Sequence, residues 1–179
     1  MIFIGLVAIA FVARMMWKRY FVDPLEKKSD EGDPDAQYCL ALEWFEGKGR
    51  TKSRLKAGSL FEKAATQGHR DAQAMLGMLY EKGAGGLPKD RAKSVHWYKK
   101  AAEQGHGPSQ CMLGRAHYHG KGIPQDFVQA YCWLNVARAR NAAAPEDIEI
   151  LTVIESKLEQ SHLLKVQRMS VELYEKIHG

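Results

Sequence analysis

The chain has 179 residues, of which 26 are Lys or Arg and 21 are Asp or Glu, so its formal net charge at pH 7 is +5. Its three cysteines are an odd number with no close pair, which does not fit a disulfide-stapled domain and suits a reducing compartment. The excess of base fits an acidic partner surface or anionic lipid, but no aromatic residues interleave with the bases to stack on nucleic acid, so we expect no nucleic-acid partner.

Residues 1–21 begin with an apolar run, Ile2–Ala13, which Arg14 interrupts before Met15, Met16 and Trp17. A membrane-spanning helix needs about 20 residues and at least about 17, a length that is reached if Arg14 extends toward the headgroups. A cleaved signal peptide would need small residues at its cleavage site, and a soluble buried helix would have a polar face. We predict a single transmembrane anchor over residues 1–21 and keep the other two as alternatives.

Basic residues follow the apolar run at positions 14, 18, 19, 27 and 28. The positive-inside rule then places the rest of the chain in the cytoplasm. Residues 22–33 are expected to form a linker. The sequence therefore predicts a single-pass protein of a bacterial inner membrane with its main domain in the cytoplasm, and the periplasm is the alternative.

A seven-residue sequence motif then occurs twice, as Lys63–His69 (KAATQGH) and as Lys100–His106 (KAAEQGH). Self-similarity at such a period is typical of stacked repeats rather than of a single globular enzyme core. We predict an all-α fold, a right-handed α-solenoid of about three antiparallel helix-hairpin repeats with C-terminal capping helices and one N-terminal apolar helix. The repeats are expected over 34–68, 69–105 and 106–140.

Turn residues support one helix hairpin per repeat. Gly83 and Gly120 fall inside the hairpins, where a residue with positive φ is needed. Pro88 cannot lie within a helix and fits the same turn. Asp90 and Asp126 are then expected to be the N-caps of the second helices, accepting hydrogen bonds from free backbone N–H groups.

The segment from Trp97 to Asp126 resembles the Sel-1-like repeat, a relative of the tetratricopeptide repeat, with Ser109 in place of Ala and His117 in place of Tyr. The first copy departs from the family pattern at Arg50–Ser53, where an apolar residue, Pro and Asp are preferred. Members of this family act mostly as adaptors in protein complexes. The resemblance therefore implies a partner-binding solenoid rather than an enzyme.

Residues 141–179 are predicted to form two more helices that cap the last repeat, because a terminal repeat exposes an apolar flank. Ser161 is a candidate N-cap for the second of them. A docking helix for another protein is the alternative. Apolar residues are spaced to line one face of each helix: Ile148, Leu151, Ile154 and Leu158, then Leu163, Val166, Leu173 and Ile177.

His117, His119 and Cys111 are the nearest approach to a catalytic or metal-binding group. Residues two apart on a helix point in different directions, and His117 takes the position of Tyr80 in the preceding repeat, so packing is the preferred interpretation. We expect no metal and no cofactor. A hydrolase that uses Cys111 or His119 remains the less favoured alternative, and Cys111 could instead pair with Cys132.

Two sets of residues are candidates for partner contact. The first helix of each repeat is expected to line a concave face, with candidate contact residues Glu43, Glu46, Met78, Glu81, Arg115 and Tyr118. Equivalent hairpin turns lie side by side in a solenoid, so their bases should form a stripe: Lys48, Arg50, Lys52, Arg54, Lys56, Lys89, Arg91 and Lys93. This stripe is either a solvated edge or a contact for an acidic protein or anionic lipid.

Overall fold

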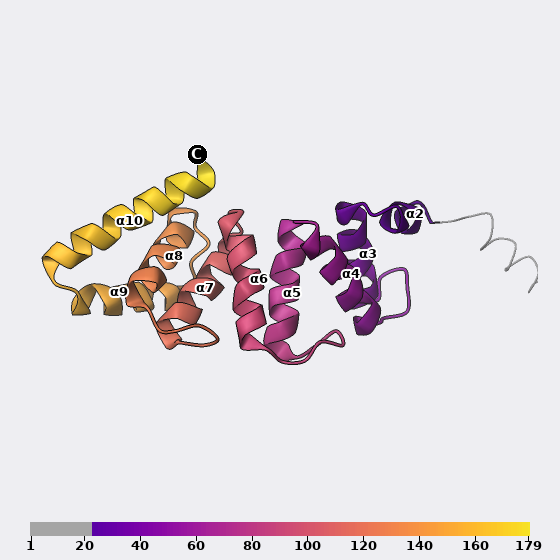
Figure 1. Cartoon of the computed structure of the whole chain (residues 1–179), viewed down its shortest axis with the longest axis horizontal. Coiled ribbons are helices and arrows are strands. Elements are labelled where there is room, and N and C mark those ends of the chain that lie inside the picture. The colour runs from indigo at the N-terminus through magenta and orange to yellow at the C-terminus, as the bar shows by residue number, and fades with distance from the viewer. Residues whose placement is uncertain (1–22) are drawn as a thin grey trace, which may run out of the picture.

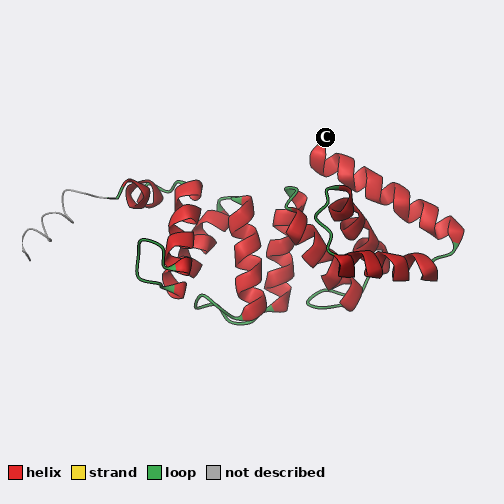
Figure 2. Ribbon diagram, turned by 180° about the vertical axis from the view of Figure 1, so that it is seen from behind, coloured by secondary structure: helices red, strands yellow, loops and turns green. Residues whose placement is uncertain are grey.

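The computed structural model describes residues 23–179, so the predicted anchor over residues 1–21 lies outside the described part of the chain. Across residues 23–179 the chain is helical and contains no strand (Figure 2). None of the helices in this range has the length and apolar character that a bilayer crossing requires. The helices are α2 (Pro24–Asp30), α3 (Pro34–Glu46), α4 (Arg54–Thr66), α5 (Arg70–Lys82), α6 (Arg91–Glu103), α7 (Gly107–His119), α8 (Phe127–Ala139), α9 (Pro145–Lys157) and α10 (Gln160–His178).

Helices α3 to α8 stand side by side in a row, and each packs mainly on the helix before it and the helix after it (Figure 1). The turns inside the hairpins α3–α4, α5–α6 and α7–α8 lie along the lower edge of Figure 1, and the turns between hairpins lie along the upper edge. This arrangement confirms the predicted α-solenoid of helix hairpins with capping helices.

Side-chain caps begin the second helix of every hairpin. Ser53 Oγ accepts a hydrogen bond from the N–H of Lys56 at 3.4 Å, and Asp90 Oδ1 accepts one from Lys93 at 2.9 Å. Asp126 caps α8 in the same way. Such caps satisfy N–H groups that have no partner within the helix, so the predicted roles of Asp90 and Asp126 are confirmed.

Small residues allow the helices to approach closely, as at Gly77 on α5. A Cβ atom at Gly77 would lie 2.7 Å from Cδ1 of Tyr98 on α6, which is shorter than a normal contact. Ala64, Ala101 and Ala137 occupy equivalent places near the ends of α4, α6 and α8 and are fully buried. The Tyr98 ring therefore packs directly against the backbone of Gly77 within the second hairpin.

The second hairpin differs from the others at its turn. The turn from Gly83 to Asp90 is one residue longer than the turns of the first and third hairpins. The extra length brings the carbonyl group of Gly85 onto α4, where a Cβ at Gly58 would overlap it. Gly58 occupies the position that Val95 has in α6. The absence of a side chain at Gly58 therefore makes room for the longer turn.

The two helices after the third repeat do not form another hairpin. Helix α9 packs on α8 and α7, whereas α10 turns back and packs on α8 (Figure 1). Val166 is buried there, and Asn135 Nδ2 donates a hydrogen bond to Ser170 Oγ at 2.7 Å. The N-cap of α10 is Glu159, without a side-chain hydrogen bond, so the prediction for Ser161 is wrong: Ser161 lies inside the first turn.

Candidate interaction surface

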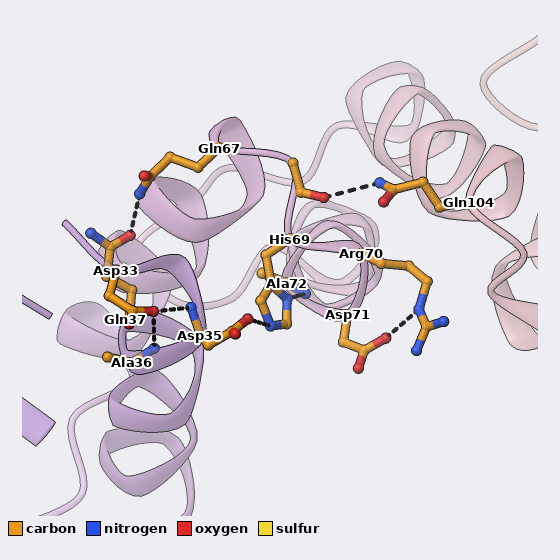
Figure 3. A network of polar contacts seen from close by, with 11 residues as sticks. Asp33, Asp35, Ala36, Gln37, Gln67, His69, Arg70, Asp71, Ala72 and Gln104 are labelled. Carbon is orange, nitrogen blue, oxygen red and sulfur yellow. Dashed lines mark hydrogen bonds and ion pairs between the residues drawn. The ribbon is translucent and has the colours of Figure 1, made fainter. Parts of the chain in front are cut away.

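The joints between repeats determine how the first helices are placed. His69 precedes α5, where its Nδ1 accepts a hydrogen bond from the N–H of Ala72 at 3.1 Å, and its Nε2 lies 3.3 Å from Asp35 Oδ1 on α3 (Figure 3). Its ring stacks on Tyr38 with centroids 4.5 Å apart. Because Nδ1 is an acceptor, Nε2 carries the proton of the neutral ring and faces the carboxylate. His69 thus caps the first helix of the second repeat and contacts the first helix of the first repeat.

Glutamine side chains connect each joint to the helices around it. Gln73 Nε2 donates to the carbonyl of Ala65 at 3.2 Å, and its Oε1 accepts from Gln104 Nε2 at 2.8 Å. Gln104 also donates to the carbonyl of Gly68 at 3.1 Å (Figure 3). These bonds hold α5 in register with α4 and α6 and so determine where the first helices lie relative to one another.

A groove runs along this surface. One cavity of about 670 Å³ lies between α3, α5 and α7, and a second of about 510 Å³ continues from it toward α9. Glu81, Tyr98 and Met112 line both cavities, so they form one continuous depression, which we call the first-helix groove. Its other members include Tyr38, Arg70, Asp71, Met75, Met78, Lys82, Arg115, Tyr118, Glu146, Ile150 and Val153.

The groove combines flexible apolar side chains with charges of both signs. Met75, Met78 and Met112 lie along it, and methionine adapts its shape to different apolar partners. Tyr98 donates a hydrogen bond from its hydroxyl to Glu81 Oε2 at 3.0 Å. Burial, together with the charge of Glu81, raises the pKa of Tyr98, so the phenol stays neutral. This composition suits an apolar or amphipathic polypeptide segment rather than a small charged ligand.

The groove contains most of the contact residues predicted from the sequence. Met78, Glu81, Arg115 and Tyr118 line it. Glu43 and Glu46 do not. Glu43 accepts a hydrogen bond of 2.6 Å from Arg50 Nε, and Glu46 lies 2.6 Å from the Lys48 ammonium. These two carboxylates are therefore engaged with the first hairpin turn.

Arg115 has a structural role besides lining the groove. Its Nε and Nη2 donate to the two carboxylate oxygens of Asp147 on α9, at 2.6 and 2.8 Å, and its Nη1 pairs with Glu146. The Asp147 side chain is 0% exposed. Burial pushes its pKa upward, but the hydrogen bonds from Arg115 and from the Ala144 N–H outweigh that effect and hold its pKa below the ordinary value. Sequence reasoning missed Asp147, because nothing local marks a carboxylate that a distant arginine will bury.

Arg50 is likewise removed from the exposed basic stripe. Its side chain is only 14% exposed and binds Glu43, Glu26 and Asp23, so it attaches α2 to the first hairpin. This contact gives a physical reason for the departure from the repeat pattern at this turn.

The other stripe residues lie on the turns and first helical turns as expected. Lys56 Nζ lies 4.1 Å from the centre of the Trp44 ring, Lys93 lies 4.0 Å from Asp90, and Lys48 pairs with Glu46. The remaining members are exposed and form no ion pair with any residue from 23 to 179: Lys52, Arg54, Lys89 and Arg91.

The cysteine and histidine candidates do not converge. Cys111 and Cys132 are free thiols that donate to the carbonyls of Ala142 and Val166, and burial raises their pKa to about 12 and about 11. A thiol with so high a pKa is a poor nucleophile at neutral pH. His119 is exposed at the end of α7. Within residues 23–179 no three His, Cys, Asp or Glu side chains are grouped to hold a metal ion.

Comparison with known proteins agrees with this architecture. The Sel1 repeat pattern matches residues 34–69, 70–106 and 107–141, one residue or less from the predicted limits. A Sel1 repeat protein from Oxalobacter formigenes is 34% identical, covering 72% of this chain and 94% of its own with a TM-score of 0.65. The protein c5321, described as a protective antigen of uropathogenic Escherichia coli with an SLR fold, is 28% identical with a TM-score of 0.63.

The alignment with c5321 covers 86% of this chain and 40% of that protein, so this chain spans less than half of its length. A comparison with curated protein sequences gives no match. Proteins built from Sel1 repeats generally mediate protein–protein interaction, and their fold is a typical non-catalytic scaffold. With three matched repeats that together cover more than half of its residues, the chain belongs to the Sel1 repeat family.

Proposed function

We propose that this protein is a membrane-tethered adaptor that binds a partner protein in a bacterial envelope-associated complex. The observation that carries the proposal is the first-helix groove, where methionine and tyrosine side chains lie among charges of both signs on the first helices of the repeats. A partner would place an apolar segment along Met78 and Met112, and its polar groups would meet Glu81 or Arg115.

Two observations support a tether at the inner membrane with the repeats in the cytoplasm. The apolar run Ile2–Ala13 is followed by basic residues, and the chain enters the described part at Asp23, beside the first hairpin turn. All three cysteines are free thiols, which suits a reducing compartment. Both similar solved structures are of bacterial proteins, which supports a bacterial origin for this chain.

A binding assay tests the groove. The full chain would be immobilised on beads and the complex recovered from detergent-solubilised membranes, for the natural protein, for Met78→Glu and for Leu164→Glu. Leu164 is a matched control because it is apolar and 53% exposed but lies on α10, away from the groove. We expect Met78→Glu to lose the partner and Leu164→Glu to keep it. Equal recovery by all three would contradict the proposed groove.

A fusion of alkaline phosphatase after Gly179 tests the orientation. The enzyme is active only where its disulfides form, so an inactive fusion is expected for a cytoplasmic repeat domain. An active fusion would contradict the cytoplasmic placement and indicate that the repeats lie in the periplasm. Binding of a partner by the groove would still be tested by the binding assay.

A further inference from the structure

An exposed leucine lies among the bases of the hairpin-turn edge. Leu55, in the first turn of α4, is 69% exposed and stands between Arg54 and Lys56. It also leans against the next hairpin turn, where a Cβ at Gly86 would overlap its Cδ1. A single exposed leucine is common on protein surfaces, so its surroundings decide whether it matters.

Successive hairpin turns place bases in a row that includes the neighbourhood of Leu55. Gly85 in the second turn approaches the backbone carbonyl of Arg54, and Gly122 in the third turn approaches that of Arg91. Each turn thus packs on the start of the preceding second helix. The basic edge, as we define it, consists of exposed side chains on these turns and on the first turns of α4 and α6, with Leu55 among them: Lys52, Arg54, Lys56, Lys89, Arg91 and Lys121.

The charges of this edge are not neutralised within residues 23–179. None of its six cations forms an ion pair with a described residue. All six are exposed. Other cations on the same hairpins do find acids, since Lys48 pairs with Glu46 and Lys93 with Asp90. The edge therefore carries an excess of unpaired positive charge beside an exposed apolar side chain.

The described part of the chain begins at the first hairpin turn. Asp23, the first described residue, is bound by Arg50 of the first hairpin turn, and α2 lies at that end of the row (Figure 1). Asp23 therefore lies beside the turn that carries Lys52. The sequence of residues 1–22 contains the apolar run Ile2–Ala13, then Arg14, and then Trp17, Lys18 and Arg19, a composition that favours the membrane interface.

We infer that the basic edge rests on an anionic phospholipid surface, with Leu55 at headgroup depth and the surrounding Lys and Arg side chains against lipid phosphates. Apolar residues surrounded by bases are the composition of surfaces that bind anionic bilayers. Arg91 and Lys121 also line the 510 Å³ cavity at the α9 end of the first-helix groove, whereas no member of the basic edge lines the cavity between α3, α5 and α7. The contact would therefore leave the latter part of the groove open to a protein partner. The inference deepens the proposed function and rests on it for the tether that brings the edge to the bilayer.

A fluorescent label at Leu55 tests the inference in the full chain. In a Cys39→Ser background, Leu55→Cys would carry an environment-sensitive dye, and Leu164→Cys on α10 would be the matched control. Cys39 is removed because it is the exposed thiol, whereas Cys111 and Cys132 are buried. Each protein would be mixed with vesicles of phosphatidylcholine alone, with vesicles that also contain phosphatidylglycerol, and with polyglutamate. Flotation of the vesicles would be measured in the same samples.

We expect a blue shift of the dye at position 55 only with phosphatidylglycerol, lost in high salt and lost in Lys52→Glu/Lys89→Glu/Arg91→Glu. The dye at position 164 should not respond. The inference is overturned if position 55 does not respond, if it responds equally to phosphatidylcholine, or if polyglutamate produces the same shift, which would indicate an acidic protein. Flotation with phosphatidylcholine alone reports the tether separately: a protein that fails to float there but still shows the phosphatidylglycerol-dependent shift refutes the tether and supports the edge.

Discussion

Arg115 on α7 and Asp147 on α9 are joined by two hydrogen bonds, of 2.6 and 2.8 Å, with the carboxylate fully buried. The pair attaches the first capping helix to the last repeat. At the other end of the row, Arg50 binds Asp23 of the segment that leads into α2. Each end of the solenoid is therefore secured by an arginine that reaches from a repeat to a flanking element.

Removal of the arginine should destabilise the C-terminal end. Arg115→Ala leaves Asp147 buried without its guanidinium partner while the Ala144 N–H still donates to it, and we expect a loss of about 2–3 kcal/mol in the free energy of unfolding at pH 7. The loss should shrink in acid, because protonation removes the unpaired charge. Urea unfolding followed by circular dichroism measures both. Lys48→Ala removes an exposed ion pair and serves as the control, with an unchanged midpoint.

The contact between Gly58 and the second hairpin turn gives a second prediction. Gly58→Ala places a methyl group against the Gly85 carbonyl, which is backbone and cannot rotate away. We expect a loss of about 1–3 kcal/mol despite the better helix propensity of alanine. Ser59→Ala changes the neighbouring exposed residue and should not destabilise. Equal stability of Gly58→Ala and the natural protein in thermal unfolding would contradict the close contact between Gly58 and the Gly85 carbonyl.

The half-buried histidines predict a loss of stability in acid. Burial lowers the pKa of His106 and of His117 in the folded protein. A depressed folded pKa means that the unfolded chain binds the proton first, so this stability is complete above about pH 6.5 and is lost as the pH falls. His106 also caps α7 through Nδ1, an acceptor that protonation would remove.

The substitution His106→Asn keeps a good cap but cannot titrate. The melting temperature of this variant should fall less between pH 7 and pH 5 than that of the natural protein. An identical fall in both proteins would show that His106 does not contribute to the acid sensitivity.

The double role of His69 can be separated by two substitutions. His69→Asn retains an acceptor for the α5 N-terminus but loses the contacts with Asp35 and Tyr38, whereas His69→Ala loses the cap as well. We expect His69→Ala to be about 1 kcal/mol less stable than His69→Asn, and both to be less stable than the natural protein. Denaturant unfolding of the three proteins gives the order, and equal stability of the two variants would mean that the cap contributes nothing.

The repeat architecture could be predicted because it depends on local signals. The glycines, prolines and aspartates of the hairpin turns act within a few residues, and the periodic phrase at Lys63 and Lys100 locates the joints. The capping histidines could also have been found, because His follows Gly at both joints. Their cap role was missed because histidine is an uncommon N-cap.

The parts that escaped prediction depend on contacts between distant segments. The pairing of Arg115 with Asp147 joins residues of different helices, and the binding of Arg50 to Asp23 leaves a predicted surface base only partly exposed. The course of α10 over α8 was also not evident, because its apolar face would fit a hairpin with α9 equally well. Four of the six candidate contact residues line the groove, since first-helix positions in a repeat share one face.

Site-specific photocrosslinking tests the central proposal, that the first-helix groove binds a protein partner. A photoreactive phenylalanine analogue would replace Met78 or Tyr118 in the groove, or Leu164 on α10 as the control, in the full chain within bacterial cells. We expect one protein adduct of discrete mass from both groove positions, lost when Met112→Glu is added and absent from position 164. No adduct from the groove, or the same adduct from all three positions, would contradict it.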